Sequence, residues 1–219
     1  DHTLRIWDLE TEKEIRSIPI PAGKIQAFAF DEAGNQAAVA LDCDNEHVIF
    51  TWDLETGKPI HELAGHTGVI HHVTFSNQGT LLVSGSEDRQ IKIWDMASGK
   101  QLQPILGHSE PVFTTTFSPD NQRIASGTLS GKIQVWSAGD SAGSLQVGWD
   151  DPTPIDQVLF SPDGQYLAAA AADHTIRLWD SFTGKLIQTF RGHTEAVQGI
   201  AFLPDGRQLV SGGADNTIR

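Results

Sequence analysis

Apolar residues along this chain fall in short runs separated by turn-forming sequences. Between residues 65 and 106 the runs are Val69–Phe75, Leu81–Ser84, Ile91–Trp94 and Leu102–Leu106. Residues that favour turns, such as Ser, Asn, Asp and Gly, lie between them. This pattern predicts four short strands joined by tight turns, which together form an antiparallel meander.

The predicted strands do not alternate cleanly between apolar and polar residues. Ile25–Phe30 and Val158–Phe160 are apolar on both faces, which is typical of a sheet that is covered on both sides. No segment carries the sustained apolar period of about 3.6 residues that marks a helix. We therefore expect an all-β protein in which neighbouring sheets cover one another.

Several features of the sequence repeat with nearly the same spacing. Tryptophans 42 to 45 residues apart mark the period, at Trp7, Trp52, Trp94, Trp136 and Trp179. An Asp follows all of these except Trp136, which is followed by Ser137. A Gly-His pair lies upstream in three repeats, at Gly65-His66, Gly107-His108 and Gly192-His193. A fixed period with these signatures indicates a repeat architecture in which each unit needs its neighbours to bury its faces.

The Trp-Asp pairs, the Gly-His pairs and the period resemble the WD40-repeat family over essentially the whole chain. The resemblance implies a β-propeller of four-stranded antiparallel blades, with about five blades' worth of sequence in one WD40 region over residues 1–219. Residues 1–18 are expected to end one blade and residues 197–219 to start another. The four blades between them are expected at about 24–63, 66–106, 109–148 and 153–190.

The number of blades in the ring remains open at the level of sequence. Asp215–Arg219 repeats the phase of Asp1–Arg5, so a five-bladed ring could close by joining the two ends. A larger ring of about seven blades is the commoner arrangement in the family. We expect a piece of such a larger propeller, because the chain starts at Asp1 rather than Met and the overlapping residues would be redundant in a closed ring.

Charge and composition exclude several classes of function. The chain has 28 acidic and 15 basic side chains, a formal net charge of −13, which argues against nucleic acid as a partner. Its apolar stretches are too short to cross a membrane. Cys43 is the only cysteine, which favours a reducing, cytoplasmic location.

One repeat contains His66, Ser84 and Asp88, which have the composition of a hydrolase triad. In WD40 proteins the same residue types, with a Trp, form a hydrogen-bond network within the blade, and recurrence in other repeats favours this structural interpretation over catalysis. Replacing His66 with Ala is expected to destabilise the fold, whereas the same change at His47 or His61 is expected to do little. The resemblance implies that the network residues are His66, Ser84, Asp88 and Trp94; His108, Ser126 and Trp136; Asp173 and Trp179; and His193, Ser211 and Asp215.

The network is predicted to be uneven from blade to blade. Ser130 stands where an Asp is expected before Trp136, and Ala169 replaces the Ser before Trp179. The nine histidines are spread mostly one to a repeat and lack the close spacing of a zinc site. We therefore expect no metal, no cofactor and no enzymatic activity.

The resemblance places partner binding on the propeller face that carries the turns between second and third strands and the starts of the first strands. The positions carried over are Gln26, Asn45, Ile70, Glu87, Phe113, Leu129, Asp156, Ala172, Gln198 and Ala214. Ile70, Phe113 and Leu129 are expected to form an apolar patch beside Glu87, of a kind that marks contact surfaces. The alternative is that Ile70 and Phe113 pack between blades.

These observations favour a non-catalytic scaffold that mediates protein–protein interactions in a signalling or regulatory assembly. Its expected partners are other proteins or peptides, or signalling domains linked to the same chain, rather than nucleic acid or membranes. The alternative is a propeller that senses a small molecule or peptide at the mouth of the central channel.

Overall fold

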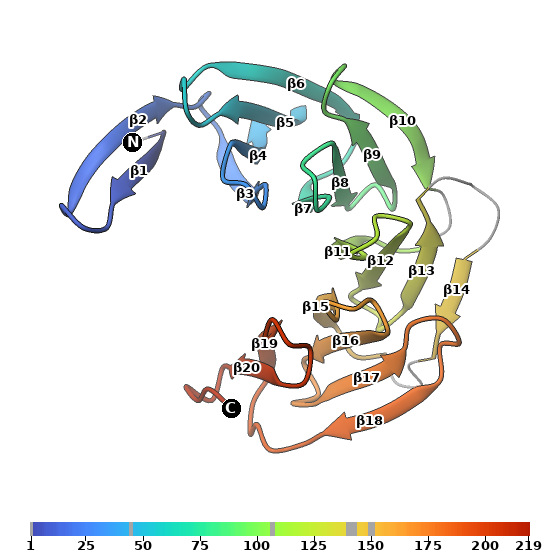
Figure 1. The fold of residues 1–219 in the computed structure, drawn as a ribbon. Helices are drawn as coiled ribbons and strands as arrows, with labels where there is room; N and C mark the ends of the chain where they lie inside the picture. The colour runs from blue at the N-terminus through green and yellow to red at the C-terminus, as the bar shows by residue number, and fades with distance from the viewer. Residues whose placement is uncertain (1, 44–45, 106–107, 139–143, 149–151) are drawn as a thin grey trace.

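A computed structural model describes residues 2–43, 46–105, 108–138, 144–148 and 152–219. Every regular element in these segments is a β-strand, which confirms the predicted all-β class. Six antiparallel sheets follow one another along an open arc (Figure 1). No helix in the described segments is long and apolar enough to span a membrane.

Four of the sheets are complete four-stranded blades, and each is a simple meander in chain order. The first blade contains β3 (Lys24–Phe30), β4 (Gln36–Cys43), β5 (Glu46–Asp53) and β6 (Pro59–His66). The second contains β7 (Ile70–Phe75), β8 (Leu81–Ser86), β9 (Ile91–Asp95) and β10 (Lys100–Ile105). The third contains β11 (Val112–Phe117), β12 (Arg123–Thr128), β13 (Ile133–Ser137) and β14 (Ser144–Val147). The fourth contains β15 (Ile155–Phe160), β16 (Tyr166–Ala171), β17 (Ile176–Asp180) and β18 (Leu186–Phe190).

A two-stranded sheet stands at each end of the arc. The first pairs β1 (Thr3–Asp8) with β2 (Lys13–Pro19), and the last pairs β19 (Val197–Phe202) with β20 (Leu209–Gly213). Trp7 on β1 occupies the same place as the tryptophans of the third strands β5, β9, β13 and β17. The strands β1 and β2 therefore correspond to the third and fourth strands of a blade, and β19 and β20 to the first and second.

The hydrophobic core lies between sheets rather than inside any one of them. Val83 and Ile93 of the second blade, for example, share a cluster with Val112 and Ile124 of the third. Trp52, Trp94, Trp136 and Trp179 are at most 7% exposed, whereas Trp7, in an end sheet, is 53% exposed. Burial of the strands on both faces explains why the sequence lacks a clean alternation of apolar and polar residues.

Arg123 on β12 also ties the third blade to the fourth by polar contacts. Its guanidinium donates to the carbonyl oxygen of Ser181 at 3.0 Å, to the Ser181 hydroxyl at 2.9 Å and to the carbonyl oxygen of Gly164 at 3.0 Å. The same group lies 4.0 Å from the centroid of the Phe182 ring, within the range of a cation–π contact. This side chain therefore fixes the fourth blade against the third.

The arc has a distinct inner side. The first strand of each blade and β19 lie on that side, whereas the fourth strands lie on the outer side (Figure 1). In an antiparallel meander, the turn between the second and third strands and the connection into the next blade lie at one end of the sheet. We use the name rim for the face of the arc that these ends of the sheets form together with the starts of the first strands. The turns between third and fourth strands lie on the opposite face.

Candidate functional site

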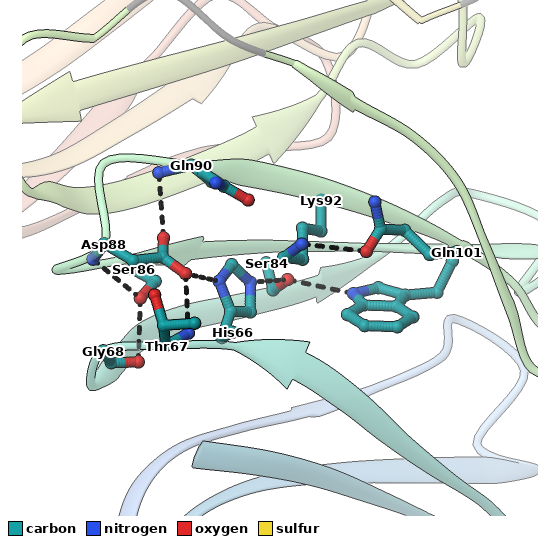
Figure 2. A network of polar contacts seen from close by, with 10 residues as sticks. His66, Thr67, Gly68, Ser84, Ser86, Asp88, Gln90, Lys92 and Gln101 are labelled. Carbon is teal, nitrogen blue, oxygen red and sulfur yellow. Dashed lines mark hydrogen bonds and ion pairs between the residues drawn. The ribbon is translucent and has the colours of Figure 1, made fainter. Parts of the chain in front are cut away.

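The second blade contains a continuous chain of side-chain hydrogen bonds. Nδ1 of His66 lies 2.8 Å from Oδ2 of Asp88, and Nε2 of His66 lies 2.7 Å from Oγ of Ser84. The indole Nε1 of Trp94 donates to the same Ser84 oxygen at 2.9 Å. Figure 2 shows Asp88, His66 and Ser84 in line across the strands. The structure thus brings together all four residues that the resemblance assigned to this network.

The glycine of the Gly-His pair has a conformational reason. The φ angle is 149° at Gly65 and 153° at Gly192. Side chains with a Cβ rarely adopt such angles, and glycine does so without penalty. The glycine therefore lets the chain turn so that the following His enters the blade.

Electrostatics favour a neutral imidazole in this network. Burial lowers the pKa of His66, although the Asp88 carboxylate acts in the opposite direction. Burial alone would raise the pKa of Asp88, but hydrogen bonds from His66, Thr67 and Gln90 outweigh it and lower that pKa to about 2. Because a carboxylate only accepts, Nδ1 of His66 carries the proton and Nε2 accepts from the Ser84 hydroxyl.

The third blade has the same hydrogen-bond network without the carboxylate. Nε2 of His108 lies 2.6 Å from Oγ of Ser126, and Nε1 of Trp136 donates to that oxygen at 2.8 Å. Ser130 replaces the carboxylate, and Nδ1 of His108 is buried without a hydrogen-bond partner among the described residues. Burial, with a smaller contribution from Lys132, lowers the pKa of His108 to about 4.

In the fourth blade, Asp173 pairs with Arg177 at 3.0 Å rather than with a His. Ala169 offers no hydroxyl there, and the indole of Trp179 donates to the carbonyl oxygen of Gly148 at 3.2 Å. In this blade the indole N–H of the Trp therefore donates its hydrogen bond to a backbone carbonyl instead of a serine hydroxyl.

The last sheet again has the full polar arrangement. Nε2 of His193 lies 2.9 Å from Oγ of Ser211, and Nδ1 lies 2.9 Å from Oδ2 of Asp215.

None of these networks is arranged for hydrolysis. Ser84 is 0% exposed and His66 is 7% exposed, so a substrate could not reach the hydroxyl. The Ser84 oxygen is also held by the Trp94 indole, which would have to be displaced before the hydroxyl attacked a substrate. In the described residues no group of three or more His, Cys, Asp or Glu side chains could hold a metal ion.

The rim is built by a β-bulge at the start of each first strand. In β7, β11 and β15 the pairing with the second strand shifts after the first residue, so that one residue is left out of the register. One residue is likewise left out of the register after the first residue of β19 and after the second residue of β3. A bulge leaves its extra residue unpaired and re-aims that side chain. The bulge residues are Gln26, His71, Phe113, Asp156 and Gln198.

The structure corrects one of the expected rim positions. Ile70 pairs with Ser86 ahead of the bulge and is 2% exposed, packed in the core between the first and second blades. The expectation that Ile70 contributes to an exposed apolar patch is therefore wrong, and the alternative, that it packs between blades, applies. His71 takes the bulge position in its place. The clue in the sequence is that His71, Phe113 and Gln198 each lie five residues after the His of a Gly-His pair.

The remaining candidate residues differ in exposure. Asp156 and Gln198 are exposed, and Gln26 and Phe113 are half-buried. In the turns between second and third strands, Glu87 is exposed and Leu129 is 46% exposed. Ala172 and Ala214 are half-buried. Asn45 lies outside the described residues.

Three of these rim residues are in contact across two blades. The His71 and Phe113 rings are stacked, with centroids 4.0 Å apart and an interplanar angle of 14°. Nε2 of His71 lies 3.4 Å from Oε1 of Glu87. The exposed Leu129 belongs to the same blade as Phe113. An aromatic pair, a carboxylate and an exposed leucine thus occur on neighbouring blades of the rim.

A cavity of about 910 Å³ lies away from the rim residues, between the fourth blade and β19–β20. Ile176, Phe190, Phe202 and Leu209 contribute apolar side chains to its lining.

Comparison with known proteins identifies the class. The family model described as "WD domain, G-beta repeat" matches residues 57–95, 99–137, 144–180 and 184–219. The chain therefore belongs to the WD40-repeat family, as the tryptophan period and the Gly-His pairs predicted. WD40 repeats generally mediate protein–protein interactions as scaffolds and are typically non-catalytic. A search of curated proteins finds no match to this chain.

Proposed function

We propose that this chain is a non-catalytic scaffold that binds a partner protein through its rim, within a regulatory or signalling assembly. The observation that carries the proposal is that the stacked His71 and Phe113 rings lie at the same end of the sheet as the exposed Leu129, because Val112 pairs with Thr128. Rigid blades hold these residues, so little conformational entropy is lost when a partner binds. Aromatic side chains of this kind are enriched among the residues that contribute most to protein interfaces.

Site-specific photo-crosslinking in native cell extract tests this proposal. A photoreactive amino acid replaces Leu129 in one protein and Leu9 in a control protein. Leu9 is 92% exposed in the turn between β1 and β2. Because these strands correspond to the third and fourth strands of a blade, this turn lies on the face opposite the rim. We expect a discrete crosslinked partner from position 129 and none from position 9.

A competition arm makes this assay specific. The unlabelled protein should suppress the crosslink from position 129, whereas unlabelled L129S protein should suppress it much less. Equal yields from positions 129 and 9, or equal competition by the two unlabelled proteins, would argue against the rim as the binding face.

A further inference from the structure

We propose that the rim recognises a positively charged side chain of the partner, an Arg or Lys next to an apolar residue, through Glu87, Phe113 and Asp156. This inference rests on the proposed function and names the chemistry of the partner. We use the name cation site for His71, Glu87, Phe113, Leu129 and Asp156. These residues come from the bulges and turns of three consecutive blades.

The aromatic part of the cation site is fixed in place. Phe113 stacks on His71 at 4.0 Å between ring centroids, and no other ring or cation contact of Phe113 is recorded in the described segments. The face of an aromatic ring attracts a guanidinium or ammonium group that lies within about 6 Å of its centroid. Because His71 already holds the ring, little side-chain freedom is lost when a cation approaches it.

Glu87 supplies one negative charge. Among the described residues it forms an ion pair only with His71, and burial lowers the pKa of that histidine despite the carboxylate beside it. The lowered pKa favours the neutral imidazole, which leaves the charge of Glu87 available to a partner. The Glu87 side chain is 50% exposed, so a cation from solution can reach it.

Asp156 supplies the second negative charge. It belongs to the fourth blade, whereas Glu87 belongs to the second blade and Phe113 to the third blade between them. Asp156 occupies the bulge of β15, next to the β11 bulge that carries Phe113. Partial burial raises the pKa of its carboxyl, and within the described residues no ion pair or side-chain hydrogen bond offsets that effect. A carboxylate that is partly desolvated and lacks a cation gains most from a partner that supplies one.

The charge of the whole chain and the neighbouring leucine complete the description of the partner. A net charge of −13 attracts basic segments over long distances and increases their association rate. Leu129 is 46% exposed on the turn next to Phe113 and offers an apolar contact beside the cation site. A basic residue next to an apolar residue in an accessible segment matches both features.

Synthetic peptides can test the cation directly. The probe is the peptide acetyl-Gly-Ser-Leu-Arg-Gly-Ser-amide, and the matched control carries citrulline, the neutral isostere of arginine, in place of Arg. Binding is measured by NMR titration of the isotope-labelled protein. We expect the arginine peptide to bind about tenfold more tightly and to shift the amide signals of His71, Phe113 and Asp156.

Charge-neutral variants locate the site. The double variant E87Q/D156N should reduce the affinity for the arginine peptide about tenfold and leave the affinity for the citrulline peptide unchanged. The matched control is E55Q/E62Q, which removes the same charge from exposed positions in the first blade. That control should retain the preference for arginine, because it alters only the long-range field.

The outcomes separate this inference from the proposed function. Equal binding of the two peptides, or equal losses in the two double variants, overturns the cation site. If a crosslinked partner is still captured at position 129 and its capture is insensitive to E87Q/D156N, the scaffold proposal stands and the cation site does not. If the arginine peptide binds as expected but no partner crosslinks at position 129, the scaffold proposal fails instead.

Discussion

Replacement of Ser84 with Ala offers the sharpest test of the hydrogen-bond network in the second blade. The Ser84 oxygen accepts from the Trp94 indole at 2.9 Å and lies 2.7 Å from Nε2 of His66. All three residues are at most 7% exposed, so water cannot readily replace the missing hydroxyl. The S84A protein would therefore contain two buried polar atoms without partners.

The expected cost follows from those two atoms. Each buried polar group that loses its partner costs about 1–3 kcal/mol, so S84A, which leaves two of them, should lower the free energy of unfolding by roughly 2–6 kcal/mol. For a chain of this length, each kcal/mol corresponds to a fall in melting temperature of roughly 2–4 °C. Steric strain does not contribute, because the fourth blade accommodates Ala169 at the equivalent position.

Denaturant unfolding followed by circular dichroism measures this cost. The control is S144A, which removes an exposed hydroxyl whose recorded hydrogen bond, from Gln134, is 3.4 Å long. A double-mutant cycle with W94F separates the Ser–Trp bond from other effects and should give a coupling energy of about 1 kcal/mol. If S84A and S144A unfold at the same denaturant concentration, the network does not stabilise the blade as argued.

Three further changes have defined outcomes. S130D should place a carboxylate near the unpartnered Nδ1 of His108 and raise the free energy of unfolding by roughly 1 kcal/mol in denaturant titrations; a less stable S130D protein would contradict this. The folded-state pKa of His108 is about 4, below the usual value of 6.5, so its contribution to stability is full above pH 6.5 and declines as pH falls toward 4. Unfolding free energies should therefore drop by roughly 2 kcal/mol between pH 7 and pH 5 on account of this histidine, and the H108Q protein should lack that component; an identical pH dependence in both proteins would refute it. R123K keeps the charge but cannot reach both Ser181 and Gly164, and thermal melts should show a loss of about 1–3 kcal/mol; an unchanged melting temperature would show that the contact between the third and fourth blades does not depend on this guanidinium.

The repeat and the network could be predicted because they depend on residues at fixed spacing. His66, Ser84 and Trp94 meet because each occupies the same phase of its own strand. Once the period is recognised, the meander brings them together without any knowledge of the loops. The complete blades and the shared interblade cores follow from the same pattern.

The apolar pattern alone does not predict the phase of the rim, because a β-bulge adds one residue to the first strand. The strands are buried on both faces, so the apolar pattern does not show which of Ile70 and His71 faces the solvent. One extra residue moves the neighbouring side chain from the core to the rim. The sequence-based assignment therefore identified the bulge residue correctly at Phe113 and Asp156, but at Ile70 it was one residue too early.

Contacts between blades were also beyond sequence reasoning. His61 is not part of the repeat and was expected to tolerate replacement, but its Nε2 lies 2.8 Å from the carbonyl oxygen of Met96 in the next blade. The Arg123–Ser181 contact likewise joins residues that are 58 positions apart. Neither pair has a spacing that recurs, so no periodic signal could reveal it. We now expect H61A to destabilise the protein.

The central claim is that the rim is the face that binds a partner. Hydrogen–deuterium exchange of the chain, free and in complex with the partner that crosslinks at position 129, tests it most directly. The account predicts protection on binding at the bulges and turns around residues 70–72, 86–89, 112–114, 128–130 and 155–157. Protection confined to the turns at 53–58, 95–100 and 180–185, at the opposite end of the blades, would contradict it.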